Sequence, residues 1–458
     1  MEEQQERLWL KHYPNGVSYD MPIPDKPLYS FLDEAVRDYP DRTATIFFGA
    51  RLTYRRLDQL ANRFAHALRK LGVQPGDRVA IMLPNCPQVV AAFYGALRAG
   101  AVVVMTNPLY VERELEYQLN DSGTRVILAL DLLKPRIEAV RSKTPLEHVI
   151  YTSIRDFLPF PLNLLYPLKQ KLPKIEAGPA THRWTDLMRQ NSPAFPPVPA
   201  KAGDVALLQY TGGTTGLSKG AMLTHKNLVA NTLQTIAWMG RGDMRAEGTS
   251  ILSALPFFHV YGLTVCMNMG VAAAGAMVLT PKFEVGGVLK LIEKHRPKLF
   301  PGAPTMYVAI INHPGVTKHN LSSIEACISG SAPLPVEVQA TFERLTGGKL
   351  VEGYGLTEAS PVTHSTPLYG MRKAGSIGLP FPDTDMKIAD LETGEKTLPP
   401  GEVGELCVRG PQVMAGYWNR PEETARVLRD GWLYTGDIGK MDEDGFTYIV
   451  DRKKDMIN

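Results

Sequence analysis

Residues 210–227 read YTGGTTGLSKGAMLTHKN and follow directly on the short apolar run 205–209. Three early glycines let the backbone turn tightly and bring its N–H groups close to a ligand, while three threonines add hydroxyls and a lysine adds positive charge. These positions are Thr211, Gly212, Gly213, Thr214, Thr215, Gly216 and Lys219. Together they predict a loop, between a strand and a helix, that holds phosphate groups.

Two other kinds of loop contain similar residues. A Walker A loop has Gly immediately before its Lys, but Ser218 stands there, so the spacing excludes a P-loop NTPase. A Gly- and Thr-rich surface loop that binds nothing remains open as an alternative. The concentration of hydroxyl, amide and cationic donors between a strand and a helix favours the phosphate-binding loop.

The loop resembles the signature of the acyl-adenylate-forming enzymes, which include acyl-CoA synthetases, peptide-synthetase adenylation domains and luciferases. Their pattern is Y-T-[SG]-G-[ST]-T-G-x-P-K-G, and here Gly212 fills the Ser/Gly place while Ser218 replaces the usual Pro. This replacement concerns only the rigidity of the loop. The resemblance implies ATP as a substrate of this chain.

Composition narrows the class of protein. The chain has 458 residues, of which 44% are hydrophobic and 21% charged, and this is typical of a globular protein with two or three units. Its net charge of +3 gives no reason to expect a nucleic-acid partner. The N-terminus is charged and lacks an apolar signal core. The four cysteines lie far apart without metal-ligand spacing, so we expect structural thiols and a cytoplasmic protein.

Helical patterns alternate with short apolar runs along most of the chain. Helices are predicted at 53–71, 88–99, 111–120, 285–295 and 335–345, and strands at 79–83, 101–105, 126–130, 276–280 and 325–330. This alternation predicts an α/β fold with parallel, doubly wound sheets.

The expected organisation has four parts. Two doubly wound α/β sub-domains cover 1–200 and 201–370, and the second contains the phosphate loop. Short runs separated by turn residues then predict a small β-rich, barrel-like sub-domain at 371–450, followed by a hinge at 451–458.

Two apolar segments raise the question of whether the protein contacts a membrane. The uncharged run 262–280 has nearly the length of a membrane span, but its Gly, Ala and Asn content favours a buried helix and strand. Residues 156–174, DFLPFPLNLLYPLKQKLPK, combine prolines, leucines, aromatics and lysines. This composition is typical of an irregular surface insertion and also suits peripheral docking on an anionic membrane face. A similar insertion occurs in the bacterial long-chain members of the family.

An aromatic cluster, LPFFHVYG, occupies residues 255–262. A histidine in such a cluster is usually a satisfied core residue. The resemblance instead implies that the segment lines an acyl pocket, with wall residues Phe257, His259, Val260 and Leu263. Some long-chain members carry an aromatic gate four residues after this His, and Leu263 stands there, so no aromatic gate is expected.

Two further segments end predicted strands, where open α/β sheets bind ligands. SGSAP at 329–333 offers small residues that let a flat ring approach the backbone, although a plain turn also explains them. EGYGLTE at 352–358 places an aromatic ring, a hydroxyl and a carboxylate close together. The resemblance implies an adenine site with Tyr354 stacked on the base, Thr357 at the α-phosphate and Glu358 on Mg²⁺. The implied adenine-site positions also include Gly330, Ser331, Ala332, Gly353 and Gly355.

Residues 430–454, DGWLYTGDIGKMDEDGFTYIVDRKK, resemble the signature of fatty acyl-CoA synthetases. Asp437 follows a Thr-Gly turn, where a carboxylate often only stabilises the turn but can also accept both ribose hydroxyls, and Arg452 can reach the same sugar. The resemblance implies catalytic roles for Lys219, Thr357, Glu358 and Arg452, Mg²⁺ ligation by Thr211 and Glu358, and a hinge at Lys454.

Members of the family have a mobile C-terminal domain beyond this hinge. The catalytic lysine of that domain has no counterpart in the given sequence. We therefore expect the large domain of a longer enzyme, with low activity as an isolated chain.

The resemblance as a whole implies an AMP-forming acid–thiol ligase. It converts a long- or medium-chain fatty acid to acyl-AMP and then to acyl-CoA, with ATP, Mg²⁺ and coenzyme A. The alternatives are an acyl-AMP ligase, a CoA ligase for another carboxylic acid, and a fragment that binds nucleotide and lipid without turnover. The sequence leaves the oligomeric state open, and a homodimer is compatible with it.

Overall fold

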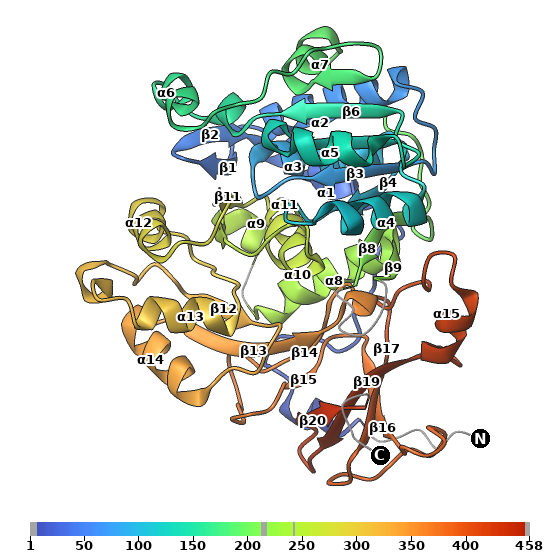
Figure 1. Cartoon of the computed structure of the whole chain (residues 1–458). Helices are drawn as coiled ribbons and strands as arrows, with labels where there is room; N and C mark the ends of the chain where they lie inside the picture. Colours follow the sequence, from blue (N-terminus) through green and yellow to red (C-terminus); the bar gives the residue numbers. More distant parts are fainter. Residues whose placement is uncertain (1–6, 212–217, 241–242, 454–458) are drawn as a thin grey trace.

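The computed structural model describes residues 7–211, 218–240 and 243–453, and Figure 1 shows their arrangement. Two α/β layers occupy the upper and middle parts of the view, and an antiparallel sheet lies at the lower right. The α/β class and the smaller β-rich part agree with the expectation from the sequence.

The upper sheet has seven strands in the order β7-β6-β5-β3-β4-β8-β9. All neighbours are parallel except β8 and β9, which are antiparallel. The strands are β3 (Arg78–Met82), β4 (Val102–Met105), β5 (Val126–Leu130), β6 (His148–Thr152), β7 (Thr181–Arg183), β8 (Val205–Tyr210) and β9 (Gly220–Thr224). Their central members are apolar without interruption because both faces of a parallel sheet are covered by helices.

Alternate side chains of these strands enter two different cores. Val79 and Ile81 of β3 pack with helices α2 and α3, whereas Ala80 and Met82 pack with α4 and α5. The helices are α2 (Tyr54–Lys70), α3 (Pro87–Arg98), α4 (Glu112–Ser122), α5 (Lys134–Arg141) and α7 (Trp184–Gln190). The sheet is therefore doubly wound, as predicted.

The middle layer consists of two four-stranded sheets, β10-β11-β1-β2 and β12-β13-β14-β15. Leu299 bridges them, because it pairs with Ile251 on one side and with Ala326 on the other. The strands are β1 (Thr43–Phe47), β2 (Ala50–Thr53), β10 (Ser250–Ser253), β11 (Ala276–Leu279), β12 (Ala326–Ser329), β13 (Lys349–Gly355), β14 (Val362–Ser365) and β15 (Leu379–Pro380).

Helices cover both faces of this middle layer. The main hydrophobic core and a second, smaller one lie on its two sides. The helices are α1 (Ser30–Asp38), α8 (His225–Trp238), α9 (Met244–Glu247), α10 (Val260–Gly262), α11 (Met269–Ala272), α12 (Val285–His295), α13 (Pro304–Ile311) and α14 (Val336–Thr346). Short helical turns are η1 (Leu8–His12), η2 (Asp131–Leu133), η3 (Ile154–Phe157), the π-helical η4 (Leu263–Asn268), η5 (Val316–Lys318) and η6 (Thr357–Ala359).

The third part is an antiparallel sheet in the order β16-β17-β19-β18, with β20 also paired to β19. Its elements are β16 (Asp385–Ala389), β17 (Gly404–Arg409), α15 (Pro421–Val427), β18 (Leu428–Arg429), β19 (Trp432–Met441) and β20 (Thr447–Arg452). The division of the chain at residue 200 stays a proposal. Strand pairing crosses this position in both directions, since β8 and β9 complete the upper sheet and β1 joins β11.

The uncharged run 262–280 forms α10 to α11 and β11, and nearly all of its side chains are buried, as predicted. Among the described residues, no helix has the length and apolar character needed to cross a membrane. The insertion at 156–174 forms the end of η3 and then α6 (Leu162–Lys169), which projects at the upper left of Figure 1.

Candidate active site

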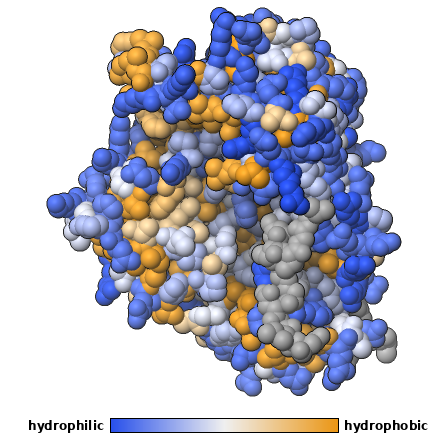
Figure 2. Space-filling model, in the orientation of Figure 1, coloured by the Kyte–Doolittle hydropathy of each residue, from blue (hydrophilic) through white to orange (hydrophobic). Residues whose placement is uncertain are grey.

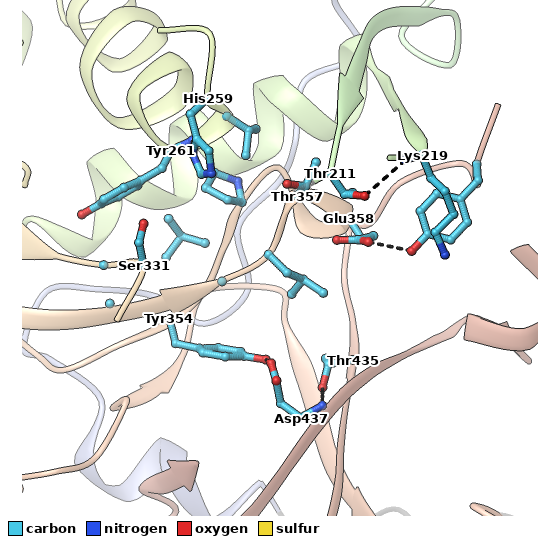
Figure 3. A pocket seen from close by; sticks show the side chains of 18 of the residues that line it. Thr211, Lys219, His259, Tyr261, Ser331, Tyr354, Thr357, Glu358, Thr435 and Asp437 are labelled. Carbon is cyan, nitrogen blue, oxygen red and sulfur yellow. Dashed lines mark hydrogen bonds between the residues drawn. The ribbon is translucent and has the colours of Figure 1, made fainter. Parts of the chain in front are cut away.

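A cavity of about 850 Å³ opens where the three parts of the fold meet. Its wall contains Thr211 from the end of β8, Lys219 before β9, Tyr354 on β13 and Asp437 on β19. Figure 3 shows these side chains directed toward one space from separate elements. Thr211 and Asp437, which lie 226 positions apart in the sequence, therefore share one site.

The start and end of the predicted phosphate loop are held close together. The Thr211 N–H donates to the Lys219 carbonyl oxygen over 2.9 Å, which continues the β8–β9 ladder. The Ser218 hydroxyl donates to the Thr211 carbonyl, and the Tyr117 hydroxyl donates to the Ser218 carbonyl over 2.8 Å. The remaining predicted loop positions, Gly212, Gly213, Thr214, Thr215 and Gly216, lie outside the described residues, as does Lys454.

Lys219 sits among acidic and aromatic groups at one side of the cavity. Its Nζ lies 2.8 Å from Glu423 Oε2 on α15 and 4.4 Å from the centre of the Tyr417 ring. The hydrogen bond to Lys219 is the main cause that lowers the pKa of Glu423. The partners of this lysine thus come from a segment about two hundred residues later in the chain.

Glu358 lies in η6 on the same side of the cavity (Figure 3). The Tyr417 hydroxyl donates to its Oε1 over 2.6 Å, and the Met414 N–H donates to its backbone carbonyl over 2.8 Å. Burial, with the Glu358 carboxylate, raises the pKa of Tyr417, so the phenol remains a donor. One carboxylate beside Thr211 suits Mg²⁺, which usually takes one or two protein carboxylates together with substrate phosphates. Among the described residues, no group of three or more His, Cys, Asp and Glu side chains could hold a metal by itself.

Tyr354 and Asp437 form the other side of the cavity. The Tyr354 hydroxyl donates to Asp437 Oδ2 over 2.5 Å, and Arg452 Nε lies 3.1 Å from Oδ1. Asp437 and Arg452 face each other in the β19–β20 ladder. Burial and the neighbouring carboxylate raise the pKa of Tyr354 well above its ordinary value. The ring is therefore held in one orientation by its own hydroxyl.

Glycines around Tyr354 permit the close approach of backbone segments. A Cβ atom at Gly355 would lie 2.1 Å from the Pro361 carbonyl oxygen, and one at Gly353 would lie 2.7 Å from Ile328 Cγ2. A side chain at either position would push apart β13 and its neighbours. The two glycines thus let Ile328 of β12 and the turn at Pro361 pack directly against this strand end beside the cavity.

His259, Val260 and Tyr261 line the cavity at the start of α10. His259 Nδ1 accepts from the Tyr261 N–H over 3.2 Å, and desolvation by the surrounding protein lowers the pKa of the imidazole. The histidine is therefore neutral at physiological pH.

Most of the predicted site residues that the structure describes line this one cavity. They are Thr211, Lys219, His259, Val260, Gly330, Ser331, Gly353, Tyr354, Gly355, Thr357, Glu358, Asp437 and Arg452. Three others do not: Phe257 and Leu263 are fully buried in the core, and Ala332 lies beyond the wall. Residues that the sequence did not suggest include Tyr117, Tyr417, Arg420, Glu423 and Thr435. Only Thr435 had a local signal, as the Thr of the Thr-Gly-Asp turn.

Comparisons with known proteins agree on one family. A family model described as AMP-binding enzyme matches residues 32–418. A long-chain-fatty-acid–CoA ligase of Bacillus subtilis is 51% identical over 459 residues, which is 99% of this chain and 81% of the relative. The structure of ATP-bound MatB from Rhodopseudomonas palustris has a TM-score of 0.82 at 32% identity and covers 95% of this chain and 80% of that one. A long-chain-fatty-acid-CoA ligase from Archaeoglobus fulgidus has a TM-score of 0.81 at 26% identity, with 96% and 86% covered.

Proposed function

The chain belongs to the AMP-binding enzyme family, and from this membership we propose that it is an AMP-forming ligase that activates a long- or medium-chain fatty acid with ATP and coenzyme A. The observation that carries the proposal is the cavity itself. Its wall contains Lys219 beside the phosphate loop, together with the Tyr354 ring and the Asp437 carboxylate, which suit a nucleoside.

We assign the nucleoside to the side of the cavity that contains Tyr354 and Asp437. A base can stack against the Tyr354 ring, which its hydrogen bond to Asp437 holds in place beside the cavity. Asp437 is an acceptor-only group when ionised and can bind two ribose hydroxyls, and Arg452 beside it can reach the same sugar. Gly330 and Ser331 complete this wall.

The triphosphate is assigned to the side that contains Thr211, Lys219, Thr357 and Glu358. A fatty acid carboxylate and a triphosphate repel each other, so the approach of the acid needs positive charge and hydrogen-bond donors. Lys219 supplies charge, while the hydroxyls of Thr211 and Thr357 supply donors. When bound, Mg²⁺ at Glu358 and Thr211 would offset further phosphate charge.

The proposed reaction has two steps, adenylation of the fatty acid and transfer of the acyl group to coenzyme A. A carboxylate oxygen attacks the α-phosphorus, the bond from that phosphorus to the bridging oxygen breaks, and pyrophosphate leaves to give acyl-AMP. The thiol sulfur of coenzyme A then attacks the acyl carbon, the carbon–oxygen bond to phosphate breaks, and AMP leaves while the thiol proton is released. The neutral His259 and the apolar side chain of Val260 suit a wall for the acyl part, because they place no charge beside it.

We propose a cytoplasmic location for the protein. All four cysteines are free and buried, which suits a reducing compartment.

Binding of adenylate analogues tests the function directly. Thermal unfolding is followed with non-hydrolysable acyl-adenylates that carry fatty chains of several lengths, an aryl group or an aminoacyl group. A ligand at about 100 times its Kd adds roughly 2.7 kcal/mol to the free energy of unfolding. We expect the fatty analogues to raise the melting temperature most. Preference for the aryl or aminoacyl analogue would overturn the assigned substrate, and exchange of labelled pyrophosphate into ATP with the same free acids provides an independent check.

A further inference from the structure

Helix α6 turns its apolar side chains away from the protein. The exposed fractions are 78% for Phe160, 43% for Leu162, 64% for Leu164, 44% for Leu165 and 82% for Leu168. In Figure 2 this corner, at the upper left, is a projecting hydrophobic cluster. Large exposed apolar side chains gathered on one element indicate a contact with another molecule or with lipid.

The orientation of the helix is the reverse of that of an ordinary surface helix. At 100° per residue, Leu162, Leu165, Leu168 and Leu164 occupy one arc of about 160°. Asn163 and Tyr166 lie on the opposite arc, where the Asn163 amide oxygen is buried and Tyr166 packs against the main hydrophobic core. An amphipathic helix normally buries its apolar arc. Here the apolar arc is left free for an outside partner.

The base of this projection is well anchored. Ile154 is buried, and Phe157 and Leu158 pack against the main core. Asp156 accepts from the Ser153 N–H and from the Thr152 hydroxyl, both over 3.0 Å. The protein therefore holds the apolar arc of α6 outward with a network of its own contacts.

The charged side chains within residues 157–173 all have one sign. Residues 157–173 contain no Asp or Glu, and Lys169 and Lys171 lie at the end of the helix. Both lysines are exposed, and within the described part of the chain neither has a carboxylate at ion-pair distance. Lys174 forms an ion pair with Glu176, and the nitrogen and oxygen atoms of these two exposed side chains lie 2.9 Å apart. Lysines beside inserted leucines are complementary to anionic lipid headgroups, and each adds roughly 1 kcal/mol to binding near such a surface.

A protein partner suits this surface less well. A stable interface buries about 800 Å² on each side and is depleted of lysine, whereas α6 is a single short helix flanked by lysines. A bilayer accepts a small apolar anchor when electrostatic attraction supports it. We propose that α6 and its flanking residues 157–174 dock on an anionic phospholipid bilayer, with the leucine arc inserted among the acyl chains and the lysines at the headgroups.

Flotation with vesicles tests the docking, and it needs no substrate, so its outcome is independent of the proposed reaction. One vesicle type contains equal parts of phosphatidylglycerol and phosphatidylcholine, and the other contains phosphatidylcholine alone. We expect binding to the anionic vesicles. Leu164→Asn with Leu168→Asn should weaken it by about tenfold or more, because two inserted side chains are lost. Lys169→Gln with Lys171→Gln should weaken it by about tenfold and remove most of the preference for the anionic lipid.

Leu109→Asn is the matched control, since Leu109 is 78% exposed on a different loop and should not affect binding. A fluorophore sensitive to its surroundings, attached at Leu168→Cys, reports the site itself, and labelling is selective because all four native cysteines are buried. Its emission should shift to the blue with anionic vesicles. The proposal is wrong if the wild type does not float, if the leucine variants bind as the wild type does, or if α6 instead mediates self-association that these variants abolish in sedimentation velocity.

Discussion

The ammonium group of Lys219 lies 2.8 Å from the Glu423 carboxylate, although the two residues belong to different parts of the fold. Arg420 Nε also approaches Glu423, at 3.8 Å, and all three side chains line the cavity. If phosphates bind at Lys219 as proposed, they compete with Glu423 for the same cation.

Glu423→Gln should therefore strengthen ATP binding. The pair is partly exposed, so the expected gain is about two- to fivefold in Kd, as measured by calorimetric titration. Glu422→Gln is a matched control, because its side chain is exposed on the same helix and does not line the cavity. Equal affinities of the two variants would show that Glu423 does not compete with the nucleotide.

Asp437→Asn should weaken the binding of AMP. The carboxylate has a side chain only 9% exposed and carries the hydrogen bond from Tyr354 and the ion pair with Arg452. Loss of charged hydrogen bonds to the ribose should cost about 1.5–3 kcal/mol, or roughly ten- to a hundredfold in Kd. Tyr354→Phe keeps the aromatic ring and should weaken AMP binding less than Asp437→Asn does. If Asp437→Asn binds AMP with an unchanged Kd, the ribose does not bind at Asp437.

Gly355→Ala should destabilise the fold as well as the site. The added Cβ would stand 2.1 Å from a backbone oxygen, which cannot move without displacing the turn at Pro361. We expect a loss of about 1–3 kcal/mol in the free energy of unfolding, measured by urea denaturation. At Gly203 an added Cβ meets no atom within 4 Å, so Gly203→Ala should have little effect. Similar losses for the two variants would contradict this account.

Glu352 should make stability depend on pH. Burial raises its pKa from 4.5 to about 7, against one hydrogen bond from the Leu334 N–H that lowers it. Between these values the folded protein binds more protons than the unfolded chain, so stability falls as pH rises from about 4.5 to about 7.

Glu352→Gln should remove this dependence and leave the protein more stable than the wild type above about pH 7, by up to about 3 kcal/mol. Melting temperatures across that pH range test it, with the exposed Glu337→Gln as a control. A pH profile that is the same for the wild type and Glu352→Gln would show that the Glu352 carboxyl is not responsible.

Local patterns predicted the repeating elements closely. The predicted helix at 53–71 is α2, Tyr54–Lys70, and the predicted strand at 126–130 is β5 with the same limits. In these segments apolar spacing and a stopping residue decide the structure, and both are visible in the sequence. The motif at 352–358 also lies at the end of a strand, as expected.

Long-range contacts could not be predicted in this way. Tyr417 reaches the site because its segment pairs with β9, through the bridge to Ala221 and the Trp418 N–H to the Gly220 carbonyl. Nothing in the residues around 417 indicates that pairing. Phe257 and Leu263 belong to the predicted acyl wall, but the turn into α10 directs them to the core while His259 and Val260 line the cavity.

The pairing of β1 with β11 has a consequence for synthesis of the chain. Strand β1 leaves the ribosome early, but its parallel neighbour ends at Leu279, so β1 cannot be covered on that edge until much of the chain has emerged. In the meantime β2 is its one other partner among the strands that the structure describes, and a two-stranded hairpin is marginally stable in water. The nascent N-terminal segment thus presents an apolar strand edge from the emergence of β2 until β11 has emerged, and we expect it to be the part of the chain that chaperones bind first.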